Sequence, residues 1–165
     1  MTALAEVNAM ALKDFLAVYG DVAEHSPWVA RKAAGRRPYA KRDDMVAAFE
    51  SVVKAAPREA QLALICAHPD LATKAKLTED STREQAGAGL GALSAEEFAR
   101  FTGLNTRYKR KFGFPFIFAV KGATKQQILA SFEERVDKPP DEEFAIALAQ
   151  VCRIFRFRIE DRVLS

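Results

Sequence analysis

The chain has 165 residues, with 25 basic and 22 acidic residues and a net charge of +3 at pH 7. This length suits one domain with a core of its own, and the near balance of charge argues against nucleic-acid binding. The longest apolar run, FPFIFAV at residues 114–120, is far shorter than the ~20 residues that span a bilayer, so no membrane contact is expected.

The aromatic and sulfur-containing residues narrow the class further. Twelve Phe against three Tyr and one Trp predict a core filled by rings. Cys66 and Cys152 stand in apolar surroundings and are predicted to be reduced core residues of a cytoplasmic protein. The N-terminus lacks the basic start and apolar stretch of a signal peptide. Two His and two Cys in unrelated contexts predict no metal site.

Apolar residues recur with helical spacing through most of the chain. Asn8 is predicted to cap a first helix that ends at Gly20. Ser26-Pro27 is expected to start a second helix, which ends at Gly35. A third helix follows over residues 45–53, and a fourth from Pro57 should stop at His68, because the residue before a proline is pushed out of the α region.

Helix starts are marked in the second half of the chain as well. Ser81, Ser94 and Thr124 each precede a Glu or Gln by three residues, the spacing of a capping box. The helix from Ser94 should end near Phe112-Gly113, and residues 114–120 are expected to form an irregular or extended buried strip. Asp141 is predicted to cap the last helix. The sequence therefore predicts an all-α fold, one compact domain over residues 1–165 with about eight helices.

His68 is the first candidate for chemistry. A histidine at a helix end often does no more than satisfy a backbone carbonyl, so a purely structural role is an open alternative. Pro69, however, fixes the local backbone, so the ring would be held in one direction. A His and a Glu from separate segments can together give and take a proton near neutral pH.

The segment Ser81–Gln85 supplies the Glu. Ser81 and Glu84 have capping spacing, so a structural role is again open, as at Ser94 and Glu97. The residues that follow distinguish Ser81 and Glu84 from Ser94 and Glu97. They are Gln85 and the small-residue run AGAGL, whose short side chains leave room for a ligand to approach the backbone. One helix start could cap itself through Ser81 and also present peptide N–H groups to an anion or carbonyl.

Arg158 is singled out by its place on the last helix. Phe144, Leu148, Val151, Phe155 and Ile159 define an apolar stripe there. Arg158 falls at the edge of that stripe, whereas Arg153 and Arg156 point away. A buried arginine must be paired or bind an anion. Two alternatives are therefore open, a carboxylate-bearing ligand and an internal ion pair with an Asp or Glu.

With these residues in place, the chain resembles the OHCU decarboxylase family, the 2-oxo-4-hydroxy-4-carboxy-5-ureidoimidazoline (OHCU) decarboxylases of urate breakdown. Five segments carry the resemblance in the family's order along nearly the whole chain. They are EHSPWVA (24–30), AHPDLA (67–72), STREQAGAGL (81–90), LNTRYKRKFGFPFIFAV (104–120) and RIFRFRIEDRV (153–163).

The resemblance implies an all-helical, cofactor-free and usually homodimeric enzyme that converts OHCU to (S)-allantoin with loss of CO2. It implies that His68 and Glu84 are the catalytic residues. It further implies a set of substrate-binding positions: Pro69, Ser81, Gln85, Phe116, Ile117, Phe118, Ala119, Val120 and Arg158. The competing hypothesis is a non-catalytic helical module that uses a groove near Arg158 for an acidic metabolite or peptide, in which case His68 would be dispensable.

Overall fold

The computed structural model describes residues 1–73 and 77–165. Within these ranges the chain forms nine helices and a single β-bridge, between Thr2 and Val163, so the prediction of an all-α fold is confirmed. Two compact units emerge, Met1–Ala67 with Val151–Ser165 (unit 1) and His68–Gln150 (unit 2). One domain over residues 1–165 stays a prediction, and each unit is described by itself.

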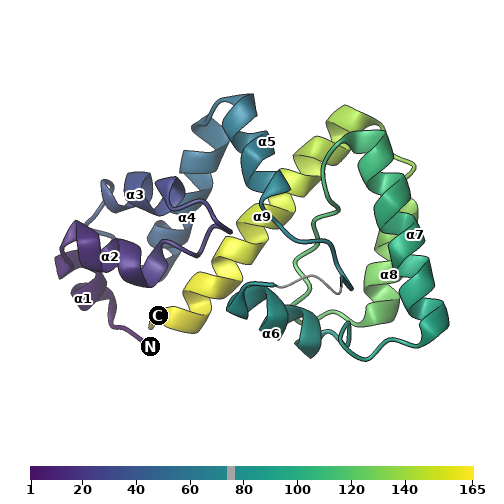
Figure 1. Ribbon diagram of the computed structural model, residues 1–165. Coiled ribbons are helices and arrows are strands. Elements are labelled where there is room, and N and C mark those ends of the chain that lie inside the picture. Colours follow the sequence, from purple (N-terminus) through teal and green to yellow (C-terminus); the bar gives the residue numbers. More distant parts are fainter. Residues whose placement is uncertain (74–76) are drawn as a thin grey trace. The chain divides into compact units, whose positions relative to one another are not determined.

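Unit 1 contains the first five helices and the end of the last one (Figure 1). Its helices are α1 (Leu4–Ala9), α2 (Leu12–Tyr19), α3 (Trp28–Ala34), α4 (Arg42–Ala55), α5 (Arg58–Cys66) and the second part of α9 (Pro140–Arg162). The rings of Phe15, Tyr19, Phe49 and Phe155 form a chain of contacts with centroids 5.1–6.5 Å apart. The predicted core of rings is therefore present in this unit.

Unit 2 contains α6 (Glu79–Gly87), α7 (Ala95–Phe112), α8 (Lys125–Arg135) and the first part of α9. Helices α7 and α8 pack against each other. Between them the chain runs through residues 114–120 without helix or strand, as predicted. The Phe116 ring stacks on Phe132 with centroids 3.8 Å apart, and Tyr108 packs edge-on against both rings.

Several predicted helix ends are confirmed. Ser94 and Thr124 each form a full capping box, in which the hydroxyl accepts a backbone N–H and the Glu97 or Gln127 side chain accepts in return. Helix α7 ends at Phe112, and Gly113 follows with φ +78°, the left-handed conformation that glycine adopts without strain. Helix α5 ends at Cys66, before His68.

Four local predictions are wrong. Asn8 caps no helix; it lies within α1, and its side chain binds the backbone of Tyr39, 31 residues away. The cap of α6 is Thr78 rather than Ser81. Helix α9 starts at Pro140, so Asp141 lies inside it. Cys152 is buried as expected, but Cys66 is exposed because α5 buries only Leu64 and Ile65.

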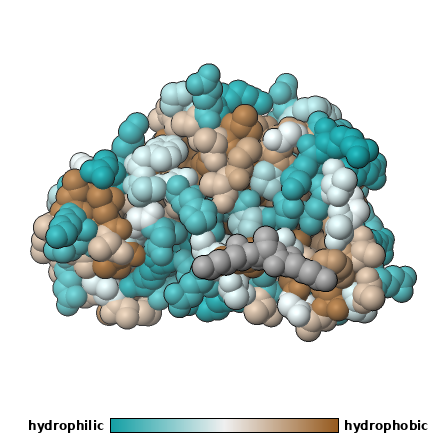
Figure 2. Space-filling view, in the orientation of Figure 1, coloured by the Kyte–Doolittle hydropathy of each residue, from teal (hydrophilic) through white to brown (hydrophobic). Residues whose placement is uncertain are grey.

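The surface and the hydropathy of the helices agree with the ordinary balance of polar and apolar residues in the sequence. Hydrophilic residues cover much of the face shown in Figure 2, with hydrophobic residues between them. None of the helices in the described ranges is long and apolar enough to cross a membrane.

Candidate functional site

His68 directly follows the C-terminal end of α5, whose last residue is Cys66 and whose cap is Ala67. The side chain is buried, with 7% of its surface exposed. Pro69 follows and restricts the backbone on its other side. The backbone on both sides of His68 is therefore constrained, and its ring lies in a buried setting, where the environment can tune a general acid or base.

The segment after His68 is tied to α6 by Gln85. The Gln85 Oε1 accepts the N–H of Ala72 at 3.0 Å, and its Nε2 donates to the carbonyl of Asp70 at 3.4 Å. Both ends of this amide thus hold backbone. The segment needs such support because Ala72 has φ +56°, in the left-handed region that is strained for a residue with a side chain.

Helix α7 supports the same segment from a second direction. The buried Asn105 donates from Nδ2 to the carbonyl of Leu71 at 2.9 Å, and Lys109 forms an ion pair with Asp70 at 2.8 Å. A cavity of about 220 Å³ adjoins this contact, lined by Asp70, Ala72, Asn105 and residues along α7. None of the predicted site residues lines this cavity.

The first turns of α6 present the other predicted polar groups. Thr78 is the cap of the helix, and its hydroxyl accepts the N–H of Ser81 at 3.3 Å. Ser81 and Gln85 are one turn apart and both buried, while Glu84 is half-buried between them in sequence. Unit 2 contains all four of the predicted polar residues His68, Ser81, Glu84 and Gln85. Within it, Gln85 joins α6 to the segment that follows His68.

The strip Phe116–Val120 belongs to unit 2 as well, and three of its peptide groups are engaged within the protein. Arg135 donates from Nη1 to the carbonyl of Ile117 at 2.7 Å. The N–H of Ala119 donates to Oε1 of Gln150 at 2.9 Å. The carbonyl of Val120 accepts the N–H of Ala123 at 3.0 Å. The remaining peptide groups of the strip are the ones that a ligand could use without displacing these bonds.

A buried charged network, which the sequence analysis missed, lies behind this strip. Arg135 donates from Nε (2.8 Å) and Nη2 (2.5 Å) to Oε1 of Glu143, and the Tyr108 hydroxyl donates to the same oxygen at 2.5 Å. Burial, and then the hydrogen bond to Glu143, raise the pKa of Tyr108 well above its ordinary value. A signal was present on α8, where Ile128, Phe132 and Arg135 follow one helical stripe.

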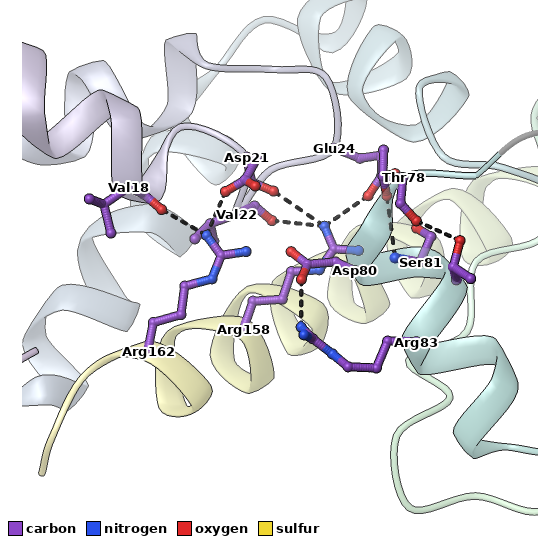
Figure 3. Close-up of polar contacts among 11 residues, drawn as sticks. Val18, Asp21, Val22, Glu24, Thr78, Asp80, Ser81, Arg83, Arg158 and Arg162 are labelled. Atoms are coloured by element: carbon purple, nitrogen blue, oxygen red, sulfur yellow. Dashed lines mark hydrogen bonds and ion pairs between the residues drawn. The ribbon is translucent and has the colours of Figure 1, made fainter. Parts of the chain in front are cut away.

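Arg158 lies in unit 1 and is buried, as its place on the apolar stripe predicted. Its Nη1 bonds Oε2 of Glu24 at 2.8 Å and approaches the carbonyls of Val22 and Asp21 at 3.3 and 3.4 Å (Figure 3). Glu24 is the first residue of the EHSPWVA segment. The internal ion pair is thus present. Contact of Arg158 with a substrate stays a prediction, as do the other predicted site residues.

Comparison with known proteins gives a consistent family. The family model described as OHCU decarboxylase matches residues 8–160. A 2-oxo-4-hydroxy-4-carboxy-5-ureidoimidazoline decarboxylase of Haloferax volcanii is 40% identical over 98% of this chain and 96% of its own length. The uric acid degradation bifunctional protein PucL of Bacillus subtilis is 42% identical over 98% of this chain. The chain spans about a third of the length of that protein, 33%.

Solved structures show the same fold. A crystal structure of (S)-allantoin synthase superposes with a TM-score of 0.83 at 28% identity, covering 100% of this chain and 55% of that one. A structure described as OHCU decarboxylase in the presence of (S)-allantoin gives a TM-score of 0.71 over 85% of this chain and 93% of that one. At 23% identity the latter supports the fold alone.

Proposed function

Because the chain belongs to the OHCU decarboxylase family, we propose that it converts OHCU to (S)-allantoin with release of CO2. One observation carries this proposal. The Haloferax volcanii decarboxylase aligns over nearly the full length of both chains at 40% identity, so the similarity covers essentially the whole of that decarboxylase.

The chemistry requires an electron sink and a controlled proton. When the C–C bond to the carboxylate breaks, its electron pair forms a double bond to the neighbouring imine carbon, whose own π pair moves onto the ring nitrogen. The imine carbon, which carries the ureido group, then takes up a proton, and the hydroxyl on the formerly carboxylated carbon loses its proton to become the ring carbonyl of allantoin. We assign the proton transfer to His68, which is buried and fixed between α5 and Pro69. Glu84 assists by orienting His68 or relaying the proton, and its half-buried place on α6 is compatible with either task.

The substrate is held by groups from four segments in this proposal. Pro69 and the polar side chains of Ser81 and Gln85 contact the ring and ureido groups, and the strip Phe116–Val120 offers peptide groups. Arg158 supplies a positive charge for a carboxylate or carbonyl. The engagement of Gln85 with the backbone of Asp70 and Ala72 makes its amide a rigid contact rather than a mobile one.

We further propose that the protein acts as a homodimer in the cytoplasm. The family resemblance supports the dimer. Two free cysteines, Cys66 and Cys152, support a reducing compartment. Neither statement affects the assignment of His68.

The test is to add the purified protein to freshly generated OHCU and to follow the formation of (S)-allantoin by circular dichroism. His68→Ala and His68→Gln should fold but lose about 10²–10⁴-fold in kcat, the usual contribution of a general acid or base. His25→Asn is the matched control, because His25 is exposed and has φ +47°, which asparagine tolerates. A fully active His68→Ala would remove the mechanism and favour the non-catalytic binding module.

A further inference from the structure

The strip Phe116–Val120 has the geometry of an extended chain. The rings of Phe116 and Phe118 stack with centroids 6.2 Å apart and planes inclined by 20°. Two residues of extended backbone span about 6.6 Å, and residues i and i+2 lie on the same side. The spacing and the parallel rings therefore indicate an extended run through Phe116, Ile117 and Phe118.

In an extended chain the N–H and C=O groups of alternate residues point to opposite sides. The carbonyl of Ile117 and the N–H of Ala119 accordingly lie on one side, where Arg135 and Gln150 bind them. The N–H and C=O of Phe118 point to the other side. Arg135 and Gln150 thus hold the strip by one edge and leave its opposite edge to a ligand.

Arg135 can fix the position of the strip Phe116–Val120 because its own side chain is held in place. Two of its nitrogens bind Glu143, and its guanidinium carbon lies 4.3 Å from the centroid of the Phe116 ring. Glu143 is fully buried and also accepts the Tyr108 hydroxyl. The guanidinium group therefore has one orientation, and its remaining nitrogen meets the Ile117 carbonyl.

We propose that Gln150 and Arg135 are positioning residues, which hold the Ile117 and Ala119 peptide groups so that the Phe118 N–H and C=O face the substrate. This inference rests on the proposed function, because it assumes that the strip contacts OHCU. Gln150 is the better residue for a test. It is half-buried, it makes a single bond to the strip, and it takes no part in the buried charged network.

The experiment compares three variants in steady-state kinetics with OHCU, by hydrogen exchange and in thermal melts. Gln150→Leu removes the acceptor for the Ala119 N–H, whereas Gln150→Glu keeps one. Gln61→Leu is the matched control. Gln61 is another half-buried glutamine with one bond to backbone, from Nε2 to the Val53 carbonyl at 2.9 Å, and it lies in unit 1.

Gln150→Leu should raise KM about three- to tenfold with little change in kcat, because one hydrogen bond's worth of uniform binding is lost. Peptides that cover residues 116–123 should exchange faster in this variant. Gln150→Glu should have the KM and the hydrogen-exchange rate of the unmodified protein. Gln61→Leu should show a similar shift in melting temperature with an unchanged KM.

The outcomes separate this inference from the proposed function. If the unmodified protein does not decarboxylate OHCU, the proposed function fails and the inference fails with it. If the unmodified protein is active, two results overturn the inference alone. One is a Gln150→Leu variant with normal KM and normal exchange, and the other is a Gln61→Leu variant that raises KM to the same extent.

Discussion

The described residues of each unit include a buried Arg–Glu pair, and the two arginines differ in how closely they approach backbone carbonyls. In unit 1, Arg158 bonds Glu24 at 2.8 Å and reaches two carbonyls only at 3.3 and 3.4 Å. In unit 2, Arg135 makes two bonds to Glu143 and a third, at 2.7 Å, to the carbonyl of Ile117. Both arginines and both glutamates are almost fully buried.

The difference teaches that burial of an arginine does not by itself mark a ligand site. Arg135 is nearly as well buried as Arg158, and its bonds to Glu143 and Ile117 assign it to positioning of the backbone. Arg158 is bonded to the Glu24 carboxylate at 2.8 Å, and its role in substrate binding is a prediction to be tested. The two arginines should therefore respond differently when stability and affinity are measured separately.

The largest effect is expected when one member of either pair loses its charge. Arg158→Met and Arg135→Met should each lower the free energy of unfolding by about 3–5 kcal/mol, because a carboxylate is left buried without its partner. Urea denaturation at pH 7 measures this loss. A loss below about 1 kcal/mol, the value of an exposed ion pair, would show that the pair in question is not buried in solution.

A smaller and more selective effect should follow when the charge is kept. Arg158→Lys loses the guanidinium fork, and a hydrogen bond to a charged group is worth about 1.5–3 kcal/mol. If Arg158 contacts the substrate, KM should rise about 10- to 100-fold, well above the rise for Gln150→Leu. Kinetics and thermal melts on the same samples decide the matter. A destabilised Arg158→Lys with unchanged KM would take Arg158 out of the site.

The stability of the two units should also differ in its dependence on alkaline pH, because the buried pair of unit 2 includes a titratable tyrosine, Tyr108, bonded to Glu143. Folding raises the pKa of Tyr108, so the folded chain keeps this proton where the unfolded chain loses it. The free energy of unfolding should therefore fall as the pH rises above about 10. Tyr108→Phe should flatten that fall, as seen in urea denaturation between about pH 9 and 11.

Three groups in unit 1, Tyr39, Cys66 and Cys152, also have a raised pKa and contribute to the alkaline loss of stability whatever happens at Tyr108. Burial raises the pKa of Cys152 to about 11 and that of Tyr39 to about 12. Each therefore contributes stability below its ordinary pKa that is lost as the pH rises through the folded value. An unchanged slope in Tyr108→Phe would mean that these three groups account for the alkaline loss.

The smallest effect is expected at Arg156, which lies on α9 close to Arg158 in sequence. Its side chain is 40% exposed and pairs with Asp43 at 3.0 Å and Glu160 at 3.4 Å. Arg156→Lys should change the free energy of unfolding by less than about 1 kcal/mol and leave KM unchanged. A large effect on either quantity would remove the contrast between exposed and buried arginines on which the other predictions depend.

Local signals in the sequence were sufficient for much of the fold. The capping boxes at Ser94 and Thr124, the end of α7 at Gly113 and the apolar stripe that buries Arg158 each involve residues within a few turns. The cap of α6 was misplaced by three residues because Thr78 and Ser81 are both good caps, and only the observed bond between them identifies which one is used.

The remaining features depend on distant residues, and no local pattern reveals them. Asn8 finds its partner at Tyr39, and Asn105 holds Leu71 from another helix. Gln150 is a polar residue on a half-exposed face of α9, with nothing in its neighbours to indicate the Ala119 N–H. For the same reason the sequence indicated that Arg158 needs an anion but could not name Glu24.

The bridge between Thr2 and Val163 has a consequence for the order of folding. Thr2 donates its N–H to the Arg162 carbonyl at 2.8 Å and accepts the Leu164 N–H at 2.9 Å, so unit 1 is completed by residues from both ends of the chain. Unit 2 is one uninterrupted stretch, residues 68–150. Contacts between distant residues carry a larger loop-closure entropy and form more slowly. During synthesis we therefore expect unit 2 to gain its native contacts first. The packing of unit 1 can be completed only after the last turns of α9 have left the ribosome.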